Sequence, residues 1–206
     1  IARWCKKNNA VIIHYSTDYV FDGTKGSPYT EEDQPNPINI YGETKLAGEV
    51  AIQQSGTIHM ILRTAWVYSM RGNNFVTKVL EWAKNSDVIR VVDDQISNPT
   101  WARALAEITA DVIAMSIEDI RSFFSIKGGL YHCAGAGYCS RFDWAQAIIS
   151  GFNTDKAVKI VRAKTWEFQT LAKRPLFSVL SCVKFGRLFL LNLPNWEYTL
   201  KIHFGG

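Results

Sequence analysis

Short apolar runs of strand length alternate with longer segments of helical periodicity along most of the chain. This alternation is typical of βαβ units, in which helices join parallel strands. The expected strands are residues 11–14, 58–62, 88–92, 130–134 and 157–161. The expected helices are residues 39–54, 74–85, 101–116 and 141–152. The pattern therefore predicts an α/β fold with a mostly parallel sheet.

The segment 22–37 is a long polar connection that contains several Pro and Gly residues. Loops of this length inside compact domains are usually functional, so we expect this one to cover a substrate. From Thr165 onward the apolar runs shorten, and no Ser/Gly linker marks a domain boundary. Two lobes, if present, must then be joined by several chain crossings rather than by a single hinge.

Composition narrows the class of protein. The 206 residues are 47% hydrophobic and 20% charged, enough to bury a core in one domain or two small lobes. The net charge of +4 is spread along the chain, which suits anionic ligands and argues against nucleic-acid partners. The cysteines form no C-x-x-C pair, so we expect neither a metal site nor disulfides. Because no apolar run approaches about 20 residues, we expect no membrane partner and a cytoplasmic location.

A candidate reaction centre begins with Tyr41 and Lys45, which lie four residues apart and therefore on one face of the expected helix. Thr17 follows the first expected strand, and ligands of open parallel sheets bind beyond the carboxyl ends of the strands. Taken alone, Tyr41 and Lys45 could be an exposed helix pair and Thr17 a turn residue. The order of strand, Thr and Tyr/Lys helix favours a shared site.

These three residue types meet the demands of carbonyl reduction, in which carbon receives a hydride and oxygen gains a proton. Free tyrosine has a pKa of about 10, too high for efficient proton exchange at neutral pH. A cation one helical turn away favours the phenolate. Tyr41 can therefore act as the proton donor with assistance from Lys45, which can also bind a cofactor ribose. Thr17 can hold the substrate oxygen and relay a proton.

The same residues carry a resemblance to the extended short-chain dehydrogenase/reductases and, within them, to the dTDP-4-dehydrorhamnose reductases. The two leading matches are His14-Tyr-Ser-Thr-Asp-Tyr-Val-Phe21 and Tyr41-Gly-Glu-Thr-Lys-Leu-Ala-Gly-Glu49. Further matches, in the order of that family, are 63–68, 72–75, 94–95, 99–100, 131–132, 174–180 and 193–196. The resemblance covers almost the whole chain.

The resemblance implies a partial Rossmann-type, doubly wound parallel sheet with a smaller α/β lobe that binds a sugar nucleotide. On this basis, we expect residues 1–68 to form the C-terminal half of a dinucleotide-binding domain. Residues 69–206 then belong mostly to the sugar-nucleotide-binding lobe, with chain crossings back to the sheet. The resemblance leaves a homodimer open.

The implied activity is reduction of the 4-keto group of a dTDP-4-dehydro-6-deoxy sugar by NADPH or NADH, as in the conversion of dTDP-4-dehydrorhamnose to dTDP-L-rhamnose. Carried over by position, Tyr41 is the proton donor, Lys45 its activator, and both bind the cofactor. Thr17, Asp18 and Trp66 then contact the dTDP-linked keto-sugar. For Trp66 the alternative is a place in the core, because large aromatic residues at strand ends usually pack. Three basic residues could meet the diphosphate: Arg71, Arg141 and Arg174.

One departure from the family concerns the cofactor. Such enzymes open with a strand, a Gly-rich turn and a helix that binds the pyrophosphate. Only 15 residues precede Ser16, so we expect the N-terminal half of the sheet to be missing and this chain alone to be inactive. A Gly-rich candidate, Gly135-Ala-Gly137 followed by Asp155, is better explained as a turn with a helix cap at Ser140.

Two other functions stay open at this point. The same fold and many of the motifs occur in the non-catalytic regulatory subunit of methionine adenosyltransferase. The presence of Thr17, Tyr41 and Lys45 favours an enzyme, because a scaffold has no chemical need for all three. Another extended-family sugar-nucleotide enzyme is the second alternative. A dehydratase usually has Asp-Glu after the Thr, whereas Asp18-Tyr19 stands here.

Overall fold

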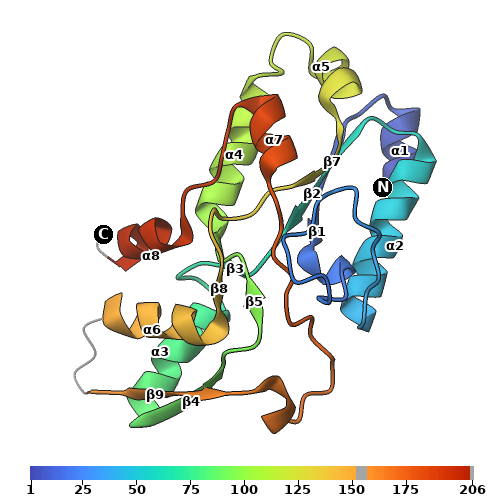
Figure 1. The fold of residues 1–206 in the computed structure, drawn as a ribbon. Coiled ribbons are helices and arrows are strands. Elements are labelled where there is room, and N and C mark those ends of the chain that lie inside the picture. The colour runs from blue at the N-terminus through green and yellow to red at the C-terminus, as the bar shows by residue number, and fades with distance from the viewer. Residues whose placement is uncertain (152–156, 205–206) are drawn as a thin grey trace.

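A three-stranded parallel sheet forms the centre of the upper part of the molecule (Figure 1). The computed structural model describes residues 1–151 and 157–204. The strands are β1 (Ile12–Thr17), β2 (His59–Thr64) and β7 (Gly129–His132), in the order β1-β2-β7. All are parallel, which confirms the α/β fold with parallel strands.

Helices cover both faces of this sheet. On one face lie α1 (Ala2–Lys7) and α2 (Ile40–Ser55). On the other lie α4 (Ala102–Ala114), α5 (Ile120–Lys127) and α7 (Val183–Phe189). The apolar side chains of these three helices bury Met60 and Leu62 of β2 together with Tyr131 of β7. Helices on both faces are the arrangement expected of a doubly wound sheet.

The lower part has a core of its own. There β4 (Val88–Val92) pairs in parallel with β9 (Lys159–Ala163), and α3 (Phe75–Asn85) and α6 (Arg141–Gly151) pack beside them. Trp144 and Ile148 of α6 are fully buried in this core, and α8 (Trp196–Phe204) packs against α6.

Short elements lie between the two cores. The pairs are β3 (Val67–Tyr68) with β6 (Thr100–Trp101), in parallel, and β5 (Ile96–Ser97) with β8 (Cys139–Ser140), antiparallel. The described residues also form two 3-10 helices, η1 (Asp18–Val20) and η2 (Thr165–Glu167).

The expected elements are present with shifted ends. The range of β4 coincides with its prediction, whereas β1 runs on to Thr17 and β9 starts at Lys159. Asn39 caps α2 because its side chain accepts a hydrogen bond from the backbone N–H of Gly42. The sequence pattern did not predict α5, α7 or α8. Residue 152, the expected end of α6, lies outside the described residues.

The chain passes between the two parts several times. Although α4, α5, β7 and α7 follow the proposed boundary at residues 68/69, β7 is a strand of the three-stranded sheet and the three helices pack on it. The boundary itself stays a prediction. Among the helices of residues 1–151 and 157–204, none has the length and apolar character needed to cross a membrane.

The loop 22–37 is fastened to the fold through Tyr29. The ring of Tyr29 stacks on Phe21 with centroids 4.1 Å apart. Its backbone N–H donates to the carbonyl of Val179, and its carbonyl accepts from the N–H of Ser181. The middle of the loop is therefore held in place, and its role as a substrate cover stays a prediction.

Candidate active site

Thr17 lies at the carboxyl end of β1, where the sheet gives way to η1. Its hydroxyl donates to Oδ1 of Asp18 at 3.1 Å and accepts from the backbone N–H of Tyr19 at 3.2 Å. The second contact caps η1, so the side chain is fixed at the strand end. Thr17 is buried beneath this turn, in the position expected from the sequence.

The first two turns of α2 bring Tyr41 and Lys45 to the same strand end. The Lys45 ammonium donates to the carbonyl oxygen of Tyr15 at 2.5 Å. The ring of Tyr41 meets the ring of Tyr19 edge to face, with centroids 5.9 Å apart. Tyr41 is 54% exposed, and its hydroxyl has no hydrogen-bond partner among the described residues. Lys45 thus contacts β1 two residues before Thr17, and Tyr41 contacts η1 two residues after it. The chemical roles of Thr17, Tyr41 and Lys45 stay proposals.

Asp18 is placed differently from its neighbour Thr17. It is 2% exposed, and its second oxygen, Oδ2, accepts from Ser178 at 2.5 Å and from Ser97 at 3.1 Å. Burial raises the pKa of Asp18 to about 6, although the hydrogen bonds from Ser178, Thr17 and Ser97 oppose the rise. Asp18 therefore fastens η1 to β5 and to the segment around Ser178. The role of Ser97 had no signal in the sequence, because that contact spans 79 positions.

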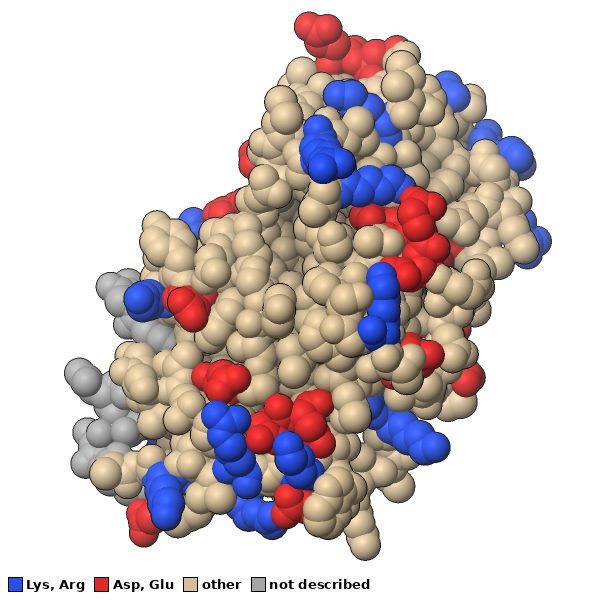
Figure 2. Space-filling view, in the orientation of Figure 1, with Lys and Arg blue, Asp and Glu red and all other residues tan. Residues whose placement is uncertain are grey.

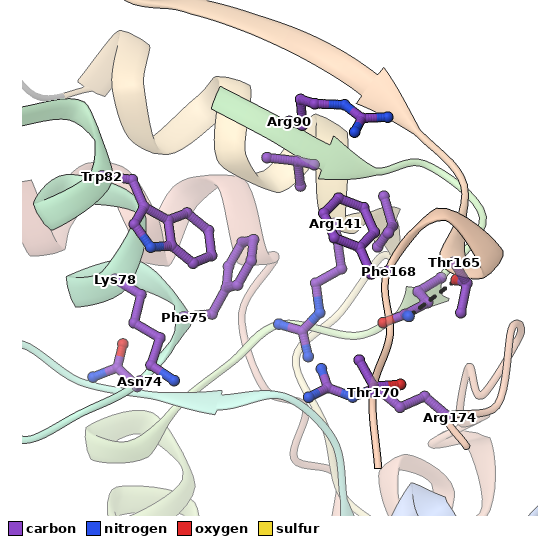
Figure 3. A pocket seen from close by; sticks show the side chains of 13 residues that line it. Asn74, Phe75, Lys78, Trp82, Arg90, Arg141, Thr165, Phe168, Thr170 and Arg174 are labelled. Carbon is purple, nitrogen blue, oxygen red and sulfur yellow. Dashed lines mark hydrogen bonds between the residues drawn. The ribbon is translucent and has the colours of Figure 1, made fainter. Parts of the chain in front are cut away.

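A cavity of about 400 Å³ lies in the lower part, between α3, β4, the start of α6 and residues 165–174 (Figure 3). Its lining residues are Asn74, Phe75, Lys78, Trp82, Arg90, Val91, Val92, Gln95, Arg141, Thr165, Phe168, Thr170 and Arg174. This lining includes four cationic side chains and no Asp or Glu among the described residues. Figure 2 shows that charges of both signs gather on the lower part. The cavity differs from this surface because the charged side chains that line it are all cations. The cavity suits an anionic ligand.

Arg141 is held in the cavity by aromatic rings. Its guanidinium lies 3.6 Å from the ring centroid of Trp66 and 4.6 Å from that of Phe75. Figure 3 shows the guanidinium groups of Arg141 and Arg174 next to each other, and within the described residues no carboxylate forms an ion pair with either. Burial lowers the pKa of Arg141 to about 10, so it remains a cation at neutral pH. Two adjacent cations of this kind can bind a diphosphate.

Tyr19 joins the cavity to the reaction centre. Burial and the Asp18 carboxylate raise the pKa of Tyr19, whereas the charges of Arg141 and Arg174 oppose the rise. The arginines of the cavity are therefore close enough to act on a residue whose ring contacts Tyr41. Tyr19 therefore lies close both to the arginines of the cavity and to Tyr41.

Trp66 stands behind Arg141 and is not among the lining residues. It stacks on Trp144 with ring centroids 5.5 Å apart. Its backbone φ is +39°, which is unusual for a bulky side chain and occurs mostly where the surroundings enforce it. Trp66 therefore supports Arg141 here, and a substrate contact stays a proposal. Arg71 is exposed and does not line the cavity.

The helix cap expected after Gly135 and Gly137 is present. Ser140 Oγ accepts from the backbone N–H of Asp143 at 3.0 Å, which caps α6. A Cβ on Gly135 would stand 2.1 Å from the carbonyl oxygen of Pro99, so glycine serves a close backbone approach at this position. Asp155 lies outside the described residues.

The fold and the site together define the class of protein. A parallel sheet with helices on both faces, and polar residues at the carboxyl end of its first strand, make this a Rossmann-type α/β protein. Sequence comparison then gives the family. The RmlD substrate binding domain matches residues 1–204, and the chain belongs to this family.

The names of similar proteins agree with this family assignment. A dTDP-4-dehydrorhamnose reductase of Burkholderia thailandensis is 37% identical over 208 residues, which cover 98% of this chain and 70% of the relative. The structure of dTDP-4-dehydrorhamnose reductase from Bacillus anthracis, in complex with NADP, matches with a TM-score of 0.86 at 34% identity. The match covers 98% of this chain and 68% of the chain in that structure.

The structure of a dTDP-4-dehydrorhamnose reductase from Clostridium acetobutylicum matches with a TM-score of 0.87 at 35% identity. This match covers 99% of this chain and 68% of the chain in that structure. The chain thus spans about two thirds of the length of these relatives. The resemblance read from the motifs is confirmed. The regulatory-subunit alternative is not favoured, because the relatives carry the names of reductases.

Proposed function

We propose that this chain carries the catalytic and sugar-nucleotide-binding residues of a reductase for dTDP-4-dehydro-6-deoxy sugars. The observation that supports it most is the grouping of Thr17, Tyr41 and Lys45 at one strand end, joined through Tyr19 to a cationic cavity. The names of the relatives point to dTDP-4-dehydrorhamnose as substrate and dTDP-L-rhamnose as product. NADPH or NADH would supply the hydride when bound.

The residues at the strand end can complete the reduction. Tyr41 is 54% exposed, so its hydroxyl can donate a proton to the carbonyl oxygen of a bound sugar. Lys45 uses one donor on the carbonyl of Tyr15, which leaves two for a cofactor ribose and for the charge that develops on Tyr41. The Thr17 hydroxyl donates to Asp18 in this structure. To donate to the sugar oxygen instead, it must rotate toward the substrate.

The cavity can bind the rest of the substrate. Arg141 and Arg174 offer two adjacent guanidinium groups for the diphosphate. Phe75, Trp82 and Phe168 line the same cavity and offer ring faces against which a nucleobase can stack. A homodimer and a cytoplasmic location remain further predictions, which light scattering and cell fractionation can test.

A reductase assay with the full-length protein tests the proposal. We expect consumption of NADPH that depends on the dTDP-keto-sugar. Tyr41→Phe should lower kcat by about 10²- to 10⁴-fold with little change in sugar-nucleotide affinity, because only the proton donor is lost. Tyr138→Phe is a matched control, since Tyr138 is also 54% exposed and does not line the cavity.

Two outcomes contradict the proposal. Wild-type protein that does not reduce the sugar nucleotide would remove the activity. A Tyr41→Phe variant as active as the Tyr138→Phe control would remove Tyr41 from its role and leave the activity in place.

A further inference from the structure

A buried ion pair lies beneath the reaction centre. Glu49 of α2 and Arg63 of β2 are 1% and 2% exposed. Nη2 of Arg63 lies 2.7 Å from Oε2 of Glu49, and Nε lies 2.9 Å from Oε1, so the contact is bidentate. The Ser16 hydroxyl donates to the same carboxylate. The Arg63 guanidinium also lies over the ring of Phe21, 5.1 Å from its centroid.

The position of Glu49 on its helix connects this pair to catalysis. Tyr41, Lys45 and Glu49 follow one another at intervals of four residues and therefore share one face of α2. A contact that fixes Glu49 also fixes the rotation of that face about the helix axis. The ion pair can thus set where Tyr41 and Lys45 point.

The partners of Glu49 hold the other side of the site. Ser16 and Arg63 are directly paired in the register of β1 with β2. Ser16 immediately precedes Thr17, and Thr17 is paired with Thr64. Glu49 therefore clamps α2 to two adjacent strands, one position before the strand end that carries Thr17.

Stability alone gives little reason for such a pair. Two charges removed from water must recover a large desolvation penalty, and apolar side chains of similar volume often stabilise a core as well or better. Nη1 of Arg63 is buried without a hydrogen-bond partner among the described residues, so the contacts of the pair do not fully offset its desolvation penalty. What the bidentate contact supplies is a defined geometry.

We propose that Glu49 and Arg63 are positioning residues of the reaction centre. They hold the Tyr41/Lys45 face of α2 at the distance and rotation from Thr17 that proton transfer requires. The inference rests on the proposed reductase function, and it assigns to this buried pair an effect on turnover rather than on substrate affinity.

The decisive variant replaces both charges, Glu49→Leu with Arg63→Met, which leaves no unpaired charge in the core. We expect a melting temperature near that of the wild type and a kcat lower by about a hundredfold, because a displacement of about 1 Å can have this effect. KM for the sugar nucleotide should change little, because the cavity is untouched. With deuterated NADPH the isotope effect on kcat should grow as the chemical step becomes limiting.

Two further variants keep the test decisive if the double variant does not fold. Ser16→Ala removes one contact of Glu49 and no charge, and we expect a folded variant with a slightly lower melting temperature and a several-fold loss of kcat. Arg103→Gln with Glu107→Gln removes an exposed ion pair of α4 and should change neither quantity.

The outcomes separate this inference from the function on which it rests. A folded double variant, or Ser16→Ala, with wild-type kcat and isotope effect would show that the pair is only structural, while the reductase function stands. Wild-type protein without reductase activity would remove the function and this inference together.

Discussion

The carbonyl oxygen of Tyr19 lies 2.1 Å from the point where a Cβ on Gly42 would stand. Since real Cβ atoms do not approach oxygen so closely, η1 and α2 are in backbone contact at this position. The contact determines how near Tyr41, the preceding residue, comes to Thr17 at the foot of η1. Gly42 is therefore part of the geometry of the site although it has no side chain.

Gly42→Ala should separate η1 from α2. We expect a loss of about 1–3 kcal/mol in the free energy of unfolding, as for other overpacked positions, together with a lower kcat. Gly48→Ala is the control on the same helix, because its Cβ would make an ordinary contact 3.8 Å from His14 Nε2. Alanine there should stabilise by up to about 1 kcal/mol. Denaturant unfolding measures both variants, and equal effects at the two positions would refute the steric argument.

That Thr17, Tyr41 and Lys45 lie near one strand end could be predicted from the sequence because these residues are local, whereas their catalytic roles stay predictions. Thr17, Tyr41 and Lys45 lie within 29 positions, and strand order and helical spacing place them on one edge. The need for glycine at position 42 could not be predicted, since it depends on where the carbonyl of Tyr19 lies after folding.

The cavity and the late helices were less predictable. Arg141 and Arg174 are 33 positions apart, and only the folded chain brings them together. Within α7, Gly186 interrupts the helical pattern, and Leu190 ends the helix with φ at +55°. This helix is stabilised by packing Phe185 and Phe189 on the sheet, a tertiary effect that outweighs local propensity.

Asp18 should make stability depend on pH. Because burial raises its pKa from 3.8 to about 6, the folded chain binds more protons than the unfolded chain between these values. The free energy of unfolding therefore falls as pH rises from 4 to 6, by on the order of 3 kcal/mol for this group.

Asp18→Asn removes this titration and keeps an oxygen that can accept from Ser178. We expect the variant to gain stability relative to the wild type as pH rises through the window. Urea unfolding at intervals between pH 4 and pH 7 measures the difference, with the exposed Asp111→Asn as control. A difference between wild type and Asp18→Asn that does not vary with pH would contradict the raised pKa.

His132 should act in the opposite direction. Burial, and then the charge of Arg63, lowers its pKa to about 3. Its Nδ1 lies 3.1 Å from the carbonyl oxygen of Tyr29, so the neutral ring carries its proton on Nδ1. In the unfolded chain the imidazole of this residue binds a proton near pH 6.5, whereas in the folded chain it stays neutral down to about pH 3. The free energy of unfolding therefore decreases as the pH falls below 6.5.

His132→Asn keeps a donor toward Tyr29 and cannot be protonated in this range. Relative to its own stability at pH 7, the variant should retain about 3 kcal/mol more than the wild type at pH 4. Urea unfolding at the two pH values gives both numbers, and the contribution of Asp18 cancels in the comparison. Parallel losses in the two proteins would show that His132 is not held neutral.

Arg174 allows a direct test of the anion site, because it is exposed and its removal should leave the fold intact. Arg174→Met should weaken the binding of dTDP to this chain by about 10- to 100-fold in calorimetric titration, as expected for loss of a charge-assisted hydrogen bond. Arg174→Lys should recover part of the affinity, since a lysine keeps the charge but not the planar fork. Arg71→Met is the matched control, being an exposed arginine that does not line the cavity. If Arg71→Met and Arg174→Met bind dTDP equally well, the diphosphate does not lie between Arg141 and Arg174.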